Sequence, residues 1–155
     1  MAINLQDEIR QTKPFARKSS EALLSILRTA TLLEHEQNEA LRAHDITLTQ
    51  YNVLRILQGA GGDGLCGRDI GERLISKVPD VSRLLDRMDE MELVSRQRDA
   101  ADRRHVTARI SAKGRRLLVQ ATPDLEALER KRFKTLRPRA VASLVSALAT
   151  VRKST

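Results

Sequence analysis

Aromatic residues are scarce in this sequence, which has no tryptophan, one tyrosine and two phenylalanines. Proteins that bind single-stranded nucleic acid stack bases on aromatic faces, so the scarcity argues against that class. The single cysteine, Cys66, excludes an internal disulfide and fits a reducing compartment. The first residues lack the apolar core of a signal peptide, and no apolar run approaches the ~20 residues that span a bilayer. We therefore expect a cytoplasmic protein with no membrane partner.

Motifs that would indicate an enzyme or a metal site are also missing. Two of the histidines, His35 and His44, lie about 2.5 helical turns apart and so on opposite faces of one predicted helix. The glycine-rich stretch 59–64 lacks the Gly-Lys-Ser/Thr ending of a phosphate-binding loop. No nucleophile and base occur in a recognisable arrangement. The sequence therefore predicts no enzyme activity, no metal site and no cofactor.

Positive charge is what the chain has in excess. Lys and Arg total 28 against 20 Asp and Glu, which gives a net charge of +8 over 155 residues. This balance favours a polyanionic partner, with nucleic acid ahead of an anionic membrane. The alternative is a soluble protein that happens to be basic. The length fits one domain with a substantial core.

Long helices are expected at both ends of the chain. Residues 16–44 contain neither Gly nor Pro and carry leucines at helical spacing, so they predict one long helix. A further helix is expected from about residue 111, with a kink near Pro123, and a last helix from about Pro138. These segments hold more apolar surface than one small domain needs. The surplus predicts a homodimer built from the two chain ends.

The middle of the chain predicts a helix-turn-helix. Thr47 and Gln50 match a capping box that starts one helix, and residues 66–75 predict a short helix that buries Ile70, Leu74 and Ile75. Pro79 suits the first turn of the following helix, and Asp80 complements its positive end. Four apolar residues then recur on one face of that helix. They are Val81, Leu84, Leu85 and Met88.

A β-hairpin should follow this second helix. Leu93-Val94 begins one strand, and alternating apolar residues at 106, 108 and 110 indicate its partner. The predicted fold is mainly α with a small β-hairpin wing: a winged helix-turn-helix with long N- and C-terminal dimerisation helices. The expected division is residues 1–45 for the N-terminal dimerisation helix, 46–115 for the DNA-binding domain and 116–155 for the C-terminal dimerisation helices.

The helix from residue 79 would enter the major groove of DNA with its N-terminal residues toward the bases. We expect Val81, Ser82, Arg83 and Arg87 to contact DNA. Ser82 would donate to a phosphate or base, and the two arginines would pair with guanine or phosphate. The alternative for Arg87 is a salt bridge within its own helix.

The hairpin carries the densest positive cluster beside this helix. Arg suits a narrow minor groove, and an acid beside an Arg can hold it in one pose. The expected DNA contacts of the wing are Arg98, Asp102, Arg103 and Arg104; the cluster also includes Arg96, Arg109, Lys113, Arg115 and Arg116. The alternative is a solvated hairpin. A second basic run, residues 130–139, is interpreted as a solvated helix end, with a supplementary DNA or RNA contact as the alternative.

Several stretches together resemble the MarR family of bacterial transcriptional regulators. They are Leu48-Thr49-x-x-x-Val53-Leu54, Ile70-Gly-Glu-Arg-Leu74, Val81-Ser-Arg-Leu-Leu-Asp-Arg-Met88, Leu93-Val94 and Asp102-Arg-Arg-x-x-x-x-x-Ile110-Ser-x-x-Gly114. The resemblance implies a winged-helix homodimer on a pseudo-palindromic operator of double-stranded DNA. It also implies repression that a small-molecule effector, aromatic or phenolic, releases. It places Ser82 and Arg83 on the recognition helix, and Asp102 and Arg104 on the wing.

This sequence departs from the family pattern at two positions. Pro79-Asp80 stands where many members have small hydroxyl residues, and Cys66 is not on the first helix, where the redox-sensing members carry their cysteine. Oxidant sensing is therefore not expected. The leading hypothesis is a sequence-specific DNA-binding regulator. Its alternative is an architectural or general nucleic-acid-binding protein, and a third is a winged domain that binds a protein partner.

Overall fold

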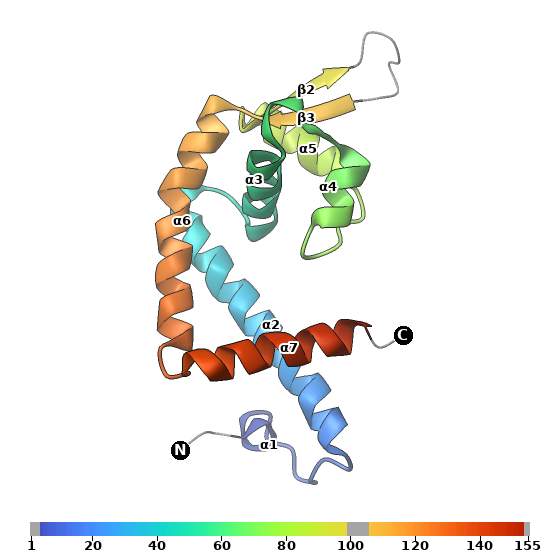
Figure 1. Cartoon of the computed structure of the whole chain (residues 1–155), viewed down its shortest axis with the longest axis vertical. Helices are drawn as coiled ribbons and strands as arrows, with labels where there is room; N and C mark the ends of the chain where they lie inside the picture. Colours follow the sequence, from blue (N-terminus) through green and yellow to red (C-terminus); the bar gives the residue numbers. More distant parts are fainter. Residues whose placement is uncertain (1–3, 99–105, 154–155) are drawn as a thin grey trace.

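The computed structural model describes residues 4–98 and 106–153, and Figure 1 shows a winged end and a helical end, with the long helices α2 and α6 running between them. The elements in chain order are α1 (Leu5–Glu8), α2 (Lys18–Leu41), the 3-10 turn η1 (Arg42–His44), α3 (Leu48–Ala60), the 3-10 turn η2 (Gly61–Asp63), β1 (Leu65–Cys66), α4 (Gly67–Arg73), α5 (Val81–Glu90), β2 (Val94–Arg98), β3 (Val106–Ile110), α6 (Ala112–Phe133) and α7 (Pro138–Lys153). The mainly helical winged helix-turn-helix predicted from the sequence is confirmed.

Most helix predictions are confirmed closely. The long helix expected over 16–44 is α2 followed by η1. The capping box is present: the Thr47 hydroxyl accepts from the Gln50 N–H at 3.2 Å, and the Gln50 side chain accepts from the Thr47 N–H at 2.9 Å. α6 continues through Pro123 as a single helix. Hydrophobic period and capping chemistry were therefore sufficient to place these elements.

Two local expectations are wrong. Pro79 is not in the first turn, because α5 begins at Val81 and Asp80 is its N-cap, accepting from the Arg83 N–H at 2.9 Å. Ile75 is 88% exposed rather than buried, because α4 ends at Arg73 and the chain is extended from Leu74. The sheet also has a third strand that the sequence did not predict, since β1 is only two residues long.

The sheet is antiparallel with the order β1-β3-β2. In the wing hairpin Val94 pairs with Ile110 and Arg98 pairs with Val106. The short strand β1 covers the other edge of β3, where Leu65 pairs with Ala108. The hairpin is thus attached to the segment that precedes α4, as well as to α5 and α6.

The core lies between the helices of the winged end and the N-terminal half of α6. Its largest fully buried side chains belong to Leu41, Val53, Leu54, Leu57, Ile70, Leu85, Met88 and Leu93. By contrast, no residue of α7 is buried within the single chain. No helix in the described ranges is both long enough and apolar enough to cross a membrane.

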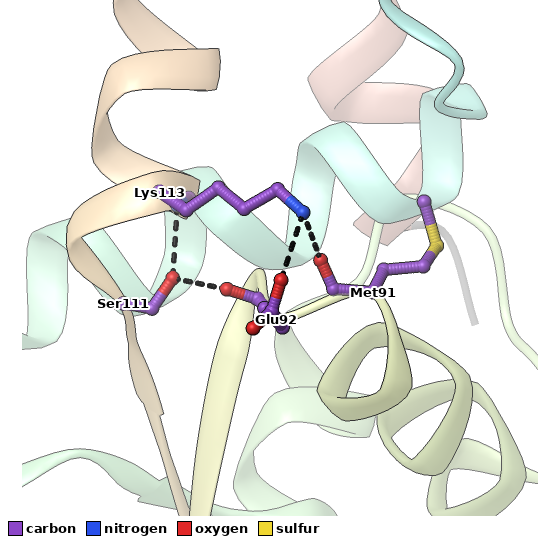
Figure 2. A network of polar contacts seen from close by, with 5 residues as sticks. Met91, Glu92, Ser111 and Lys113 are labelled. Atoms are coloured by element: carbon purple, nitrogen blue, oxygen red, sulfur yellow. Dashed lines mark hydrogen bonds and ion pairs between the residues drawn. The ribbon is translucent and has the colours of Figure 1, made fainter.

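The junction of α5, β2 and α6 is held by a small polar network (Figure 2). Glu92 adopts a left-handed backbone with φ 61°, which turns the chain from α5 into β2. Lys113 donates to the Met91 carbonyl at 2.9 Å and lies 3.3 Å from the Glu92 carboxylate. The Ser111 hydroxyl donates to the Glu92 carbonyl at 2.6 Å and accepts from the Gly114 N–H at 2.9 Å. The start of α6 is thereby attached to the end of α5.

Gly114 allows this close approach, since a Cβ there would lie 2.2 Å from the Leu93 carbonyl oxygen. We expect Gly114→Ala to lower the free energy of unfolding by about 1–3 kcal/mol, because backbone atoms must shift. Urea unfolding measures the loss. Gly59→Ala is the matched control: it lies in α3 with nothing within 4 Å of its Cβ position. It should raise stability by about 0.5–1 kcal/mol. Equal effects at both positions would contradict the packing argument.

Candidate nucleic-acid interface

The structure places the four helix residues expected at DNA on α5, but not on one face. Val81 is half-buried and packs on the core beside α4. Ser82, Arg83 and Arg87 are exposed. Within the described part of the chain, neither Arg83 nor Arg87 forms an ion pair, so the intrahelical salt bridge considered for Arg87 is not formed there. Both guanidinium groups are therefore available to an external acceptor.

Arg96 of β2 joins the wing to α5, a role that the sequence did not reveal. Its guanidinium forms an ion pair with Asp86 and donates to the Ser82 hydroxyl at 3.4 Å. Ser82 and Asp86 are four residues apart, so they share the face of α5 that looks toward the hairpin. Because Arg96 donates to the Ser82 oxygen, the Ser82 proton is left to point toward another acceptor.

The positive cluster of the hairpin is partly structural. Arg109 donates to the Asp63 carbonyl at 3.4 Å, and Lys113 belongs to the α5–α6 junction. Arg98 ends β2, is exposed, and has no ion pair among the described residues. The other three wing residues expected at DNA, namely Asp102, Arg103 and Arg104, lie outside the described residues.

A groove of about 760 Å³ runs between the wing, the start of α4 and α5. Arg68, Ser82, Arg96 and Thr107 contribute polar groups to its lining. Arg68 pairs only loosely, with its Nε 3.6 Å from Glu72. The groove therefore offers hydroxyl and guanidinium donors between the two elements that carry the predicted contacts.

A second hollow lies at the other side of α3, against α2 and α6. Its volume is about 350 Å³, and its lining includes Leu33, Tyr51, Arg55, Thr122 and Phe133. The Tyr51 hydroxyl lies 3.0 Å from the Thr122 hydroxyl, which itself donates to the Leu118 carbonyl at 2.7 Å. An adjoining hollow of about 300 Å³ shares Tyr51 and Arg55. In the described ranges, no three His, Cys, Asp or Glu side chains gather as a metal-binding cluster.

Comparison with known proteins identifies this arrangement. The sequence profile of the MarR family matches residues 44–105, a range that includes α3, α4, α5 and β2. Over this part of its length the chain is similar to members of the MarR family. A curated member, the HTH-type transcriptional regulator MhqR of Bacillus subtilis, is 26% identical over 107 residues, covering 69% of this chain and 72% of that protein.

Two solved structures share the fold over nearly the whole chain. The S. aureus MepR–DNA complex superposes with a TM-score of 0.75 at 23% identity, covering 92% of this chain and 100% of that one. The organohalide-sensing regulator RdhR-CbdbA1625, in its form with bound 2,4-dichlorophenol, gives a TM-score of 0.82 at 16% identity. It covers 94% of this chain and 88% of that one. The long terminal helices are thus part of the shared fold.

The Arg96 contact should contribute measurably to stability. The side chains of Arg96 and Asp86 are 21% and 57% exposed, so solvent screens the pair only in part. In a double-mutant cycle with Arg96→Met and Asp86→Asn, we expect a coupling energy of about 0.5–1 kcal/mol from urea unfolding. Arg98→Met, on the same strand but without an ion pair among the described residues, should change stability by less than about 0.5 kcal/mol. If the effects of the two substitutions on the free energy of unfolding simply add, the Arg96–Asp86 ion pair does not contribute to stability.

Proposed function

We propose that the chain is a homodimeric, sequence-specific transcriptional regulator that binds double-stranded DNA in the cytoplasm. It acts as a repressor that a small-molecule effector releases. Residues 46–115 form its DNA-binding part, and residues 1–45 and 116–155 form the dimer. No enzyme activity is part of the proposal.

The observation that carries the DNA-binding role is the fixed pairing of α5 with the hairpin. Arg96 holds β2 against the face of α5 that carries Ser82 and Asp86, while Arg83 and Arg87 remain exposed. α5 would enter the major groove and the hairpin the adjacent minor groove. Ser82 would then donate to a phosphate or to a base acceptor, because its oxygen already accepts from Arg96. The MepR–DNA complex, in which a protein of the same fold is bound to DNA, supports this role.

The homodimer is supported by apolar surface that the single chain leaves uncovered. Leu23 and Leu27 of α2 are 58% and 55% exposed, and Val145 and Val151 of α7 are each 60% exposed. A monomer rarely exposes contiguous apolar helix faces, so a second copy is the natural cover. A two-fold dimer would present two copies of α5 to half-sites about 34 Å apart.

The effector is proposed to occupy the hollow beside Tyr51. This site lies between α3 and the helices α2 and α6, so a ligand there can shift α2 and the later turns of α6 relative to the winged end. Its size suits a small aromatic molecule. The Arg55 guanidinium can donate to a phenolic oxygen, and the Tyr51 hydroxyl oxygen can accept from a phenolic O–H. The organohalide sensor RdhR-CbdbA1625, which binds 2,4-dichlorophenol, supports this chemical class.

Selection of bound fragments from random duplex DNA tests sequence specificity. We expect a pseudo-palindromic site bound roughly 10³-fold or more above bulk DNA. Arg83→Ala should lower affinity for that site by about 1–3 kcal/mol and relax the preference at one base pair in each half-site. Arg42→Ala, on the turn η1 with a 76% exposed side chain, is the control and should leave affinity unchanged. Loss of all site preference in the unaltered protein would favour the architectural alternative.

Arg104→Ala tests the wing. It should weaken binding to every duplex and lower the steepness of the salt dependence by about one unit, because one phosphate contact disappears. Titrations of fluorescent duplex at several salt concentrations measure the slope. An unchanged slope together with unchanged affinity would remove Arg104 from the interface.

The effector site can be tested with 2,4-dichlorophenol as the probe. We expect the compound to raise the melting temperature and to weaken binding to the selected DNA site. Arg55→Ala should reduce both effects severalfold, while Arg42→Ala, exposed on the neighbouring turn η1, should not. If Arg55→Ala and Arg42→Ala respond as the unaltered protein does, the phenolic oxygen is not held by Arg55.

A further inference from the structure

The positive charge of this chain is unevenly distributed. Residues 130–155 contain eight Lys or Arg and no Asp or Glu, whereas the first 129 residues contain 20 of each kind. The whole net charge of +8 therefore lies in the last 26 residues. The described part of this segment, residues 130–153, contains the end of α6 and all of α7, and it lies outside the proposed DNA-binding part.

Four of these cations form what we call the basic corner: Lys131, Lys134, Arg137 and Arg139. They surround the turn from α6 to α7, where the Leu136 N–H donates to the Phe133 carbonyl at 3.0 Å. All four are exposed, and none has an ion pair among the described residues. Their neighbours differ, because Arg130 lies 3.7 Å from Glu126 and Arg132 pairs with Glu36 of α2.

The helix dipole explains the positions of only some of the four cations in the basic corner. Cations in the last turn of α6 are stabilised by the negative end of the helix dipole. Arg137 and Arg139 stand at the opposite kind of site, the positive N-terminal end of α7, whose first turn has no acidic residue. Two arginines at that end raise the local positive potential, and no acidic side chain among residues 4–98 and 106–153 forms an ion pair with them. An external anion would supply the compensation.

We propose that the basic corner binds the phosphate backbone of a second DNA duplex while the winged end holds the first. This inference rests on the proposed function. α6 has 22 residues and so spans about 33 Å, with the wing at one end and the corner at the other (Figure 1). Because the two surfaces face opposite ends of the helix, the corner takes a separate duplex segment. The dimer would thereby connect two stretches of DNA.

Duplex DNA fits the corner better than other polyanions. Single-stranded nucleic acid needs aromatic stacking platforms, and the aromatic side chain beside the corner, Phe133, is half-buried. A membrane-surface helix inserts its apolar face into lipid, but the apolar face of α7 is proposed to pack in the dimer. Cations held at a turn, without base-reading neighbours, suit phosphate contacts that are independent of sequence.

Three variant sets of the full chain separate the two surfaces. The wing variant carries Arg83→Ala, Arg98→Ala and Arg104→Ala, and the corner variant carries Gln at Lys131, Lys134, Arg137 and Arg139. The matched control removes the same charge from the N-terminal arm, with Gln at Arg10, Lys13, Arg17 and Lys18; the Lys18 side chain, which pairs with Glu21, is 94% exposed. Circular dichroism and hydrodynamic size confirm that each variant folds and assembles.

The probe is a short duplex of random sequence, titrated at several salt concentrations. The wing variant should retain weak binding to this duplex. A plot of the logarithm of its binding constant against the logarithm of the salt concentration should have a slope of about −3.6, since each of four phosphate contacts contributes about 0.9. Adding the corner substitutions should abolish this binding, and adding the control substitutions should not. Protein held on the immobilised selected site should also capture a second, labelled duplex, and the corner variant should lose the capture while keeping its affinity for that site.

Other outcomes overturn the inference. The inference is wrong if the wing variant binds duplex equally well with and without the corner substitutions. It is also wrong if the control substitutions reduce duplex binding as much as the corner substitutions do. Corner-dependent binding to phosphatidylserine vesicles but not to duplex would assign the surface to a membrane instead. If the wing substitutions change nothing while the corner substitutions remove all duplex binding, the proposed function fails and the corner is the DNA site.

Discussion

The close approach of α6 to the end of α5 is the constraint on which the rest of the structure depends. Only a residue without a Cβ fits at position 114, because the Leu93 carbonyl occupies the space. That carbonyl also accepts from the Ser111 N–H at 3.1 Å, so the start of β2 and the start of α6 are joined at the same atom. The direction of α6 relative to α5 is therefore set by backbone contact, which resists deformation more than side-chain packing does.

Two attachments hold α5, one at each end. Arg96 holds its first two turns against β2, and Lys113 and Ser111 hold its C-terminal end to α6. These attachments connect α5 to the hairpin at one end and to the start of α6 at the other. Because the start of α6 is fixed to α5, an effector beside Tyr51 would act through α2 and the later turns of α6, and thus on the distance between two copies of α5 in the dimer.

Much of this arrangement could be predicted from the sequence, because long periodic stripes and capping residues are local signals. The hairpin, the capping box at Thr47 and the continuous α6 all follow from such patterns. β1 was missed because a strand of two residues is too short to show an alternation of apolar and polar residues. The start of α5 was placed too early because proline is favourable both in the first turn of a helix and just before the N-cap residue. Arg96 was counted as one of several cations: its partners on α5 lie 10 and 14 residues away, and only the fold brings them together.

The division of charge along the chain also affects how the molecule approaches DNA. A body with no net charge over its first 129 residues and +8 over the rest is a strong permanent electric dipole. In a two-fold dimer, the components of the two dipoles along the symmetry axis add. Within the screening length of ~8 Å at physiological salt, a polyanion is therefore attracted to the helical end as well as to the arginines of the hairpin. An encounter at the helical end does not place α5 in a groove, so the rate of productive association should depend less steeply on salt than the net charge suggests.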